Sequence, residues 1–152
     1  MKPLTRAIAW GGLTAGTGDF IFALSFYGVK LQVFQTVAAA LIGREAAYAG
    51  GTATFALGTA LHYAIALLWA ALFCVAGRRW PVLLRQAAVC GLAYGLVVWA
   101  VMNHVVLPLS ALHVPAWPPH PQAPVLAAHA FLFGLPIALA ARRALLGGPV
   151  RG

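Results

Sequence analysis

Four long apolar stretches follow one another along the chain, at about residues 7–29, 53–76, 86–109 and 123–141. Each has roughly 20 residues, which is the length that a helix needs to cross a hydrocarbon core about 30 Å thick. Backbone groups in lipid must be hydrogen-bonded internally, so only helices and closed barrels can cross it, and these runs lack the alternation of barrel strands. The pattern predicts an all-α integral membrane protein, a four-helix bundle forming one transmembrane domain over residues 1–152.

The segment between the first two stretches, residues 30–52, is too short and too polar to span a membrane. Its apolar residues, such as Phe34 and Leu41, recur at helical spacing, while Gln32 and Gln35 take the other face. This pattern predicts a short interfacial or re-entrant helix in an outer loop. The helix is either a lid or spacer on the membrane, or it lines an access path with one of the two glutamines.

The second outer loop, residues 110–122, contains a proline-rich run that favours extended backbone over helix. Further prolines fall inside the last two apolar stretches. Pro108 marks the end of the third predicted helix, and Gly134 with Pro136 predicts a kink in the fourth.

Composition supports the membrane assignment. The chain is 8% charged and 62% hydrophobic, whereas a soluble domain is typically about a quarter charged. The two cysteines, Cys74 and Cys90, fall near the predicted cytoplasmic ends of neighbouring helices, where a reducing compartment keeps thiols free.

Basic residues are placed as membrane topology requires. Of the ten lysines and arginines, only Lys30 and Arg44 lie in the first outer loop. The others flank the apolar stretches on one side: Lys2, Arg6, Arg78, Arg79, Arg85, Arg142, Arg143 and Arg151. The positive-inside rule then predicts that both termini are cytoplasmic. We therefore expect the formal charge of +8 to meet anionic lipid headgroups of the bilayer, and no nucleic acid is expected as a partner.

Each apolar stretch carries one ionisable residue near its middle or outer end: Asp19, His62, His104 or His129. Measured from the outer helix ends at 1.5 Å per residue, all lie roughly 8 to 15 Å below the outer surface. An ionisable group inside a membrane is costly and is a functional-site hypothesis by default. We therefore expect one shared polar site in the extracytoplasmic half.

Other polar residues extend the predicted site toward the outer surface. Asn103 precedes His104, while His113 and His120 lie in the outer loop and are expected to control access. Together with Asn103, the side chains of Ser25, Tyr27 and Tyr63 could extend a polar path toward the outer surface.

Three chemistries suit these residues, and the sequence leaves them open. One carboxylate and three imidazoles match ligand sets of a transition metal such as zinc, iron or copper, although the chain has no HxxxH or ExxH pair. Aspartate and histidine also form proton or ion relays. Finally, polar side chains in lipid can simply hydrogen-bond one another and fix helix packing.

Catalysis is not indicated by any motif. Ser25 or Ser110 beside a histidine would need an activating arrangement for which no sequence pattern exists. The glycine-rich segment GGLTAGTGDF lies in a predicted spanning helix and contains no GxGxxG, so it is interpreted as a packing surface.

A family resemblance rests on three segments. These are LHYAIALLWAALFCVAGRRWP with His62, Cys74 and Pro81, then MNHVVLPLSAL with His104 and Pro108, and LAAHAFLFGLP with His129. The chain resembles the YagU-like family of bacterial inner-membrane proteins, more closely over 62–141 than before it. The resemblance implies a multi-pass protein of the bacterial inner membrane with histidines in its helices, and it implies no activity or ligand.

Together these observations favour a small transporter, channel or ligand-binding membrane protein that uses the polar site for a proton or metal ion. The alternative is an accessory or scaffold subunit of a larger membrane complex, in which the same residues are structural. A homo-oligomer or a membrane-complex partner is compatible with either function.

Overall fold

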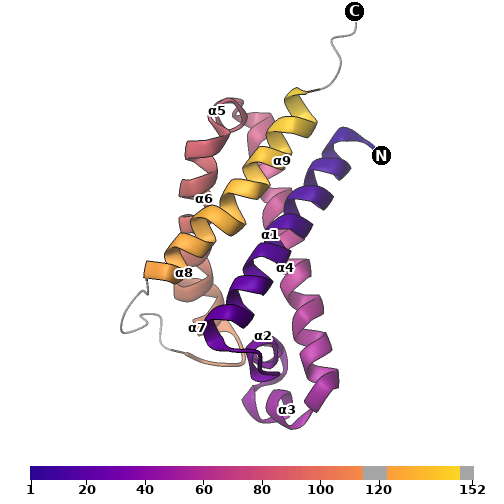
Figure 1. The fold of residues 1–152 in the computed structure, drawn as a ribbon, viewed down its shortest axis with the longest axis vertical. Coiled ribbons are helices and arrows are strands. Elements are labelled where there is room, and N and C mark those ends of the chain that lie inside the picture. Colours follow the sequence, from indigo (N-terminus) through magenta and orange to yellow (C-terminus); the bar gives the residue numbers. More distant parts are fainter. Residues whose placement is uncertain (115–122, 148–152) are drawn as a thin grey trace, which may run out of the picture.

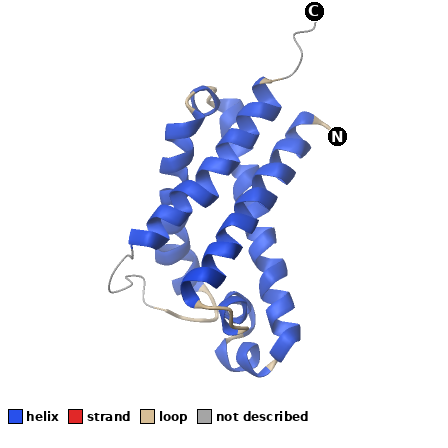
Figure 2. Cartoon of the chain, in the orientation of Figure 1, coloured by secondary structure: helices blue, strands red, loops and turns tan. Residues whose placement is uncertain are grey.

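The computed structural model describes residues 1–114 and 123–147, and these ranges contain helices and connecting turns but no strand (Figure 2). Four helical segments are long and apolar enough to cross a membrane: Pro3–Tyr27, Gly51–Arg79, Ala87–Leu109 and Ala123–Leu146. The prediction of an all-α chain with four candidate spans is therefore confirmed.

The first two spans are uninterrupted helices, α1 (Pro3–Tyr27) and α4 (Gly51–Arg79). Both extend beyond the predicted stretches at their basic ends. Pro3 suits the first turn of α1, where its missing N–H would be unpaired in any residue. At the other end, Gly28 ends α1 with φ of +88°, a conformation that residues with a side chain rarely adopt.

The third and fourth spans each contain a π-helical segment. The third consists of α6 (Ala87–Val101), η1 (Met102–Val106) and α7 (Leu107–Leu109), and the fourth of α8 (Ala123–Ala128), η2 (His129–Gly134) and α9 (Leu135–Leu146).

A proline lies just after each π-helical segment. Pro108 and Pro136 lack the N–H groups that would bond, in an α-helix, to the carbonyls of His104 and Leu132. A wider π turn accommodates the local loss of α-helical bonding. Where the sequence predicts a kink at Gly134 and Pro136, the structure has such a turn.

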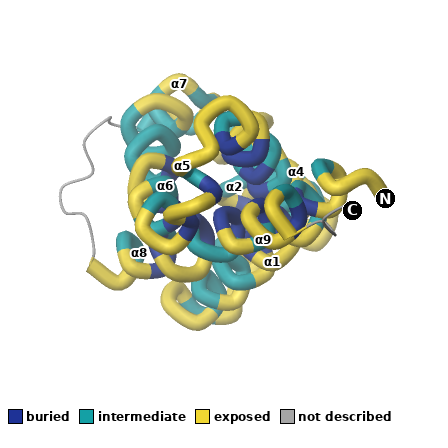
Figure 3. Tube along the Cα trace, turned by 90° about the horizontal axis from the view of Figure 1, so that it is seen from above, coloured by how far each residue is buried: buried dark blue, intermediate teal, exposed yellow. Residues whose placement is uncertain are grey.

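Four pairs of helical elements form the core (Figures 1 and 3). α1 packs against both α9 and α4, and α6 packs against α9 and η2. The buried residues are mostly alanines, with Phe73, Leu84, Val98, Phe133 and Ile137 as the large members. Small residues let helix backbones approach closely, which is how helices associate in lipid.

The glycine pairs GxxxG lie at these close contacts. Gly12 and Gly16 of α1 face Leu67 and Tyr63 of α4. Gly91 and Gly95 of α6 face the backbone of η2 and α9, where Gly134 lies against them. Both pairs therefore contribute to packing within one chain.

The segment after α1 forms two short helices, α2 (Gln32–Ile42) and α3 (Arg44–Ala49), at one end of the molecule (Figure 1). α2 packs on the start of α4, with the Phe34 carbonyl directly against Gly58. The predicted helix between the first two spans is thus present.

Gln35 anchors α2 to α4. Its side chain is buried, and Nε2 donates to the carbonyl of Gly51 at 2.9 Å and to Thr54 Oγ1 at 3.1 Å. Gln32 is exposed. Gln35 therefore holds the two helices together and does not line an open path.

The opposite end of the molecule carries the start of α1, the end of α9 and the short helix α5 (Val82–Arg85) (Figure 1). Arg78 and Arg79 end α4 and Arg85 ends α5 at that end. Most of the basic residues of the described chain thus gather at one end of the molecule.

Candidate polar site

His62 joins α4 to α1. Its Nε2 atom lies 2.9 Å from the carbonyl oxygen of Gly16, so the imidazole donates from Nε2. Three aromatic rings surround the half-buried imidazole: Phe34 at 5.3 Å, Tyr63 at 5.5 Å and Phe20 at 6.3 Å between ring centres. The hydrogen bond and the rings fix both position and tautomer of His62.

Asp19 lies about one turn beyond Gly16 on α1 and is partly exposed. It shares the face of α1 that carries Gly12 and Gly16, the face that packs on α4. None of the hydrogen bonds in the described part of the chain ends on its carboxyl group.

His129 begins the π-helical segment η2, and its Nδ1 atom lies 2.9 Å from the Val125 carbonyl of the preceding turn. The ring also lies near Phe133, 6.2 Å away between ring centres. This imidazole is satisfied within its own helix.

His104 lies in the other π-helical segment, η1, with its ring edge-on to Trp99 at 5.5 Å. The neighbouring Asn103 donates from Nδ2 to the Trp99 carbonyl at 2.9 Å. Both side chains therefore pack back along their own helix toward Trp99.

These residues do not converge as a metal site. No group of three or more histidine, cysteine, aspartate or glutamate residues able to hold a metal ion occurs within residues 1–114 and 123–147. The structure therefore gives no support to a zinc, iron or copper centre built from Asp19, His62, His104 and His129.

The separation of His104 from His129 shows that these two residues do not share the depth predicted from the sequence. Gly95 of α6 lies against the backbone carbonyl of His129. His104 is nine residues beyond Gly95, which corresponds to about 13 Å along a helix. Depths measured from helix ends ignore the tilt and rotation of each helix.

Of the two loop histidines, His113 is exposed and has a positive φ of 48°. The loop before it is tied to α2 by a hydrogen bond of 3.0 Å from the Ala111 N–H to the Ala40 carbonyl. His120 lies outside the described residues. The predicted control of access by these histidines stays a prediction.

A polar contact that was not expected from the sequence joins α1 to α4 beside Gly16. The hydroxyl groups of Thr17 on α1 and Tyr63 on α4 are 3.0 Å apart. Thr17 adjoins Gly16, where the two helices are closest, so its position next to a small residue was the available signal. By contrast, Ser25 bonds to the Ile21 carbonyl of its own helix at 2.8 Å.

The four long apolar helices indicate a multi-pass membrane protein in which α1 and α4 share a polar contact surface. No protein-family model, curated protein or solved structure matches the chain. The resemblance to YagU-like proteins therefore stays an expectation from sequence.

Proposed function

We propose that this chain is a small bacterial inner-membrane protein that binds a proton or a small cation at Asp19, as a transporter, channel or binding protein. One observation carries the proposal. Asp19 is the only acidic side chain within the four candidate spans, because the other acidic residue of the chain, Glu45, belongs to the short helix α3.

A carboxyl group inside a membrane is costly and needs a compensating role. Asp19 is not used as a structural tie, since the hydrogen bonds of His62 and His129 run to backbone carbonyls. It remains partly exposed on a packed helix face. A carboxyl group with free acceptor oxygens is suited to take up a proton or a hard cation.

The neighbourhood of Asp19 supports a polar site along the contact between α1 and α4. Thr17 and Tyr63 supply a hydroxyl pair, and His62 bonds to the carbonyl of Gly16, three residues before Asp19 on α1. In this proposal His62 positions α1 against α4, while Asp19 binds the ion. His104 and Asn103 belong to a separate helix and are kept only as residues along an outward path.

For the topology, we propose a four-helix membrane bundle with both termini in the cytoplasm. The support is the gathering of basic residues at the end of the molecule where α1 begins and α9 ends (Figure 1). Asp19 then belongs to the extracytoplasmic half, because it lies in the part of α1 that leads to α2 and α3.

The decisive experiment compares Asp19→Asn with Glu45→Gln in reconstituted liposomes. Infrared difference spectra of the protein with and without the cation should show a perturbed carboxylate band in wild type and Glu45→Gln that is absent in Asp19→Asn. A voltage-driven flux measurement with a pH-sensitive dye, repeated with sodium and potassium, identifies the ion and separates conduction from binding.

The outcomes are distinct. Flux that disappears in Asp19→Asn identifies a transporter or channel, and a cation-dependent carboxylate band without flux identifies a binding protein. If Asp19→Asn binds cations and conducts like wild type, the proposal is rejected. Stoichiometric transition metal in wild type that is lost in a quadruple alanine variant of Asp19, His62, His104 and His129 would restore the metal-site hypothesis.

A second candidate function is an accessory or scaffold subunit of a membrane complex. It is favoured by the carbonyl hydrogen bonds of His62 and His129, which are what purely structural polar residues would make. Purification under mild conditions with a defined, stoichiometric partner, together with unchanged partner binding in Asp19→Asn, would support it.

A further inference from the structure

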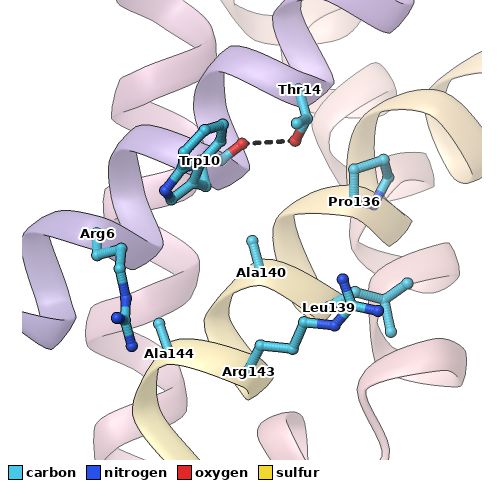
Figure 4. Close-up of a pocket in the computed structure, with 8 residues that line it drawn as sticks. All are labelled: Arg6, Trp10, Thr14, Pro136, Leu139, Ala140, Arg143 and Ala144. Carbon is cyan, nitrogen blue, oxygen red and sulfur yellow. Dashed lines mark hydrogen bonds between the residues drawn. The ribbon is translucent and has the colours of Figure 1, made fainter. Parts of the chain in front are cut away.

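A groove of about 440 Å³ runs between α1 and α9 near the basic end of the molecule (Figure 4). Its wall on α1 consists of Arg6, Trp10 and Thr14. These are four residues apart and therefore lie along one face of the helix. The volume falls within the range of about 300 to 1,000 Å³ that is usual for small-molecule sites.

The opposite wall and the floor come from α9, at two consecutive helical turns of one face: Pro136, Leu139, Ala140, Arg143 and Ala144. Ala140 and Ala144 lie between the larger side chains in Figure 4. Gly11 lies against Ile137 and Ala140, so α1 and α9 are close together and the groove is a shallow channel. The channel is open along the side of the bundle, where Trp10 and Leu139 are exposed.

Two cationic side chains line this groove. Arg6 and Arg143 are both exposed and come from separate helices, and in Figure 4 the Arg143 side chain extends along α9 toward Leu139. The rest of the lining is apolar apart from the Trp10 N–H and Thr14, whose hydroxyl already bonds to the carbonyls of Trp10 and Gly11. The groove thus combines two cationic side chains with a lining that is otherwise largely apolar.

No acidic side chain of the chain lies near the two arginines. Asp19 is thirteen residues beyond Arg6 on the same helix, or about 20 Å. Glu45 belongs to α3 at the opposite end of the molecule (Figure 1). Two like charges that share a groove favour an external anion, and guanidinium groups bind phosphate through charge-assisted hydrogen bonds.

We propose that this groove binds one anionic phospholipid of the surrounding leaflet, with its phosphate held by Arg6 and Arg143. The acyl chain runs along Ala144, Ala140 and Pro136 beneath the Trp10 ring. Basic sites between spanning helices at the cytoplasmic side bind such headgroups in other membrane proteins, and tryptophan prefers the depth of the headgroup boundary. The proposal depends on the membrane placement of α1 and α9 and is independent of ion binding at Asp19.

The test is native mass spectrometry of the full chain in detergent with phosphatidylglycerol or phosphatidylcholine of identical acyl chains. Wild type should retain one phosphatidylglycerol and discriminate against phosphatidylcholine. The double variant Arg6→Gln/Arg143→Gln should lose about thirtyfold in affinity, as expected for two guanidinium–phosphate contacts. Arg6→Lys/Arg143→Lys keeps both charges and should retain part of the binding.

The matched control is Arg78→Gln/Arg142→Gln, which removes two exposed arginines at the same end of the molecule that do not line the groove. It should change the affinity by less than about threefold. Equal losses in the two double variants would mean that only overall charge matters, and equal retention of both lipids by wild type would mean no headgroup recognition. Either result overturns the proposal.

Position is tested by fluorescence, because bromine on an acyl chain quenches a nearby tryptophan. The emission that is lost on Trp10→Phe substitution belongs to Trp10, so subtracting the two proteins isolates it. Brominated phosphatidylglycerol should quench this component more than brominated phosphatidylcholine, and the preference should vanish in Arg6→Gln/Arg143→Gln. Displacement of the lipid by inorganic phosphate alone would point to a free-phosphate site and contradict the lipid proposal.

Discussion

The imidazole of His62 and the backbone carbonyl of Gly16 are joined by a hydrogen bond of 2.9 Å that crosses from α4 to α1. Gly16 makes the contact possible, because a Cβ atom there would lie 2.9 Å from the Tyr63 ring. A glycine on one helix and a histidine on the other thus determine together how closely the first two spans approach.

We predict that His62→Phe, which keeps an aromatic ring but removes the hydrogen bond, lowers the free energy of unfolding by about 0.6 to 2 kcal/mol. The measurement is unfolding in detergent followed by circular dichroism. Tyr63→Phe is the control, since it removes only the exposed hydroxyl contact with Thr17 and should cost less. Equal stability of His62→Phe and wild type would show that the bond contributes nothing.

Replacing Asp19, unlike replacing His62, should not lower the free energy of unfolding. Because no hydrogen bond of the described residues ends on its carboxyl group, Asp19→Asn should unfold with a free energy no lower than that of wild type. The same denaturation experiment measures it. A marked loss of stability would assign Asp19 a structural role and weaken the proposal of ion binding.

The spans were predictable because hydrophobic length alone defines them, and the predicted stretches agree with the four observed helices to within a few residues at most ends. The polar site was less predictable. The sequence predicts a similar depth in the membrane for Asp19, His62, His104 and His129. It does not predict the tilt and rotation of each helix, because these depend on where the helix backbones can touch. Gly16, Gly95 and Gly134 determine those contacts.

The π-helical segments were equally hidden. A π turn differs from an α turn by one residue in its hydrogen bonding, so hydropathy does not register it. The nearby prolines indicated only that regular α-helix is interrupted, so that Gly134 with Pro136 predicted a kink and Pro108 a helix end.

Gln35 and Gln32 offer a matched pair on α2. Gln35→Ala should loosen α2 from α4, because it removes two hydrogen bonds from a buried site and leaves the Gly51 carbonyl with one donor fewer. We expect a loss of about 1 to 3 kcal/mol in the local opening free energy. Hydrogen exchange over residues 32–42 measures it.

Gln32→Ala is the control for this prediction, since Gln32 is exposed and should be replaceable without effect. Faster exchange in both variants alike would mean that Gln35 is not the anchor of α2.

Glycine replacements should separate close helix contacts from ordinary ones. In Gly95→Ala the new Cβ would overlap the His129 carbonyl and lie 2.8 Å from the Ala130 Cα, so α6 and η2 must move apart. We expect a cost of about 1 to 3 kcal/mol in unfolding free energy. Thermal unfolding in detergent tests this.

Gly11→Ala is the matched substitution, with its nearest contact at an ordinary 3.4 Å from the Ile137 Cα. It should be neutral or slightly stabilising, since alanine favours helix over glycine by up to about 1 kcal/mol. Similar losses in the two variants would contradict the assignment of Gly95 as the tight crossing.

The π-helical segments η1 and η2 have a consequence for how the third and fourth spans can change. Each holds an extra residue that the helix has absorbed, and adding or removing one residue turns everything beyond it by about 100°. The contacts of Gly91 and Gly95 lie on the basic side of η1, whereas Gly95 contacts His129 and Ala130 at the start of η2. A single insertion or deletion in η1 would therefore rotate the outer turns of the third span while leaving the inner ones in place. The direction of His104 can thus change independently of the packing of α6 on the fourth span, whereas His129 is held at that contact.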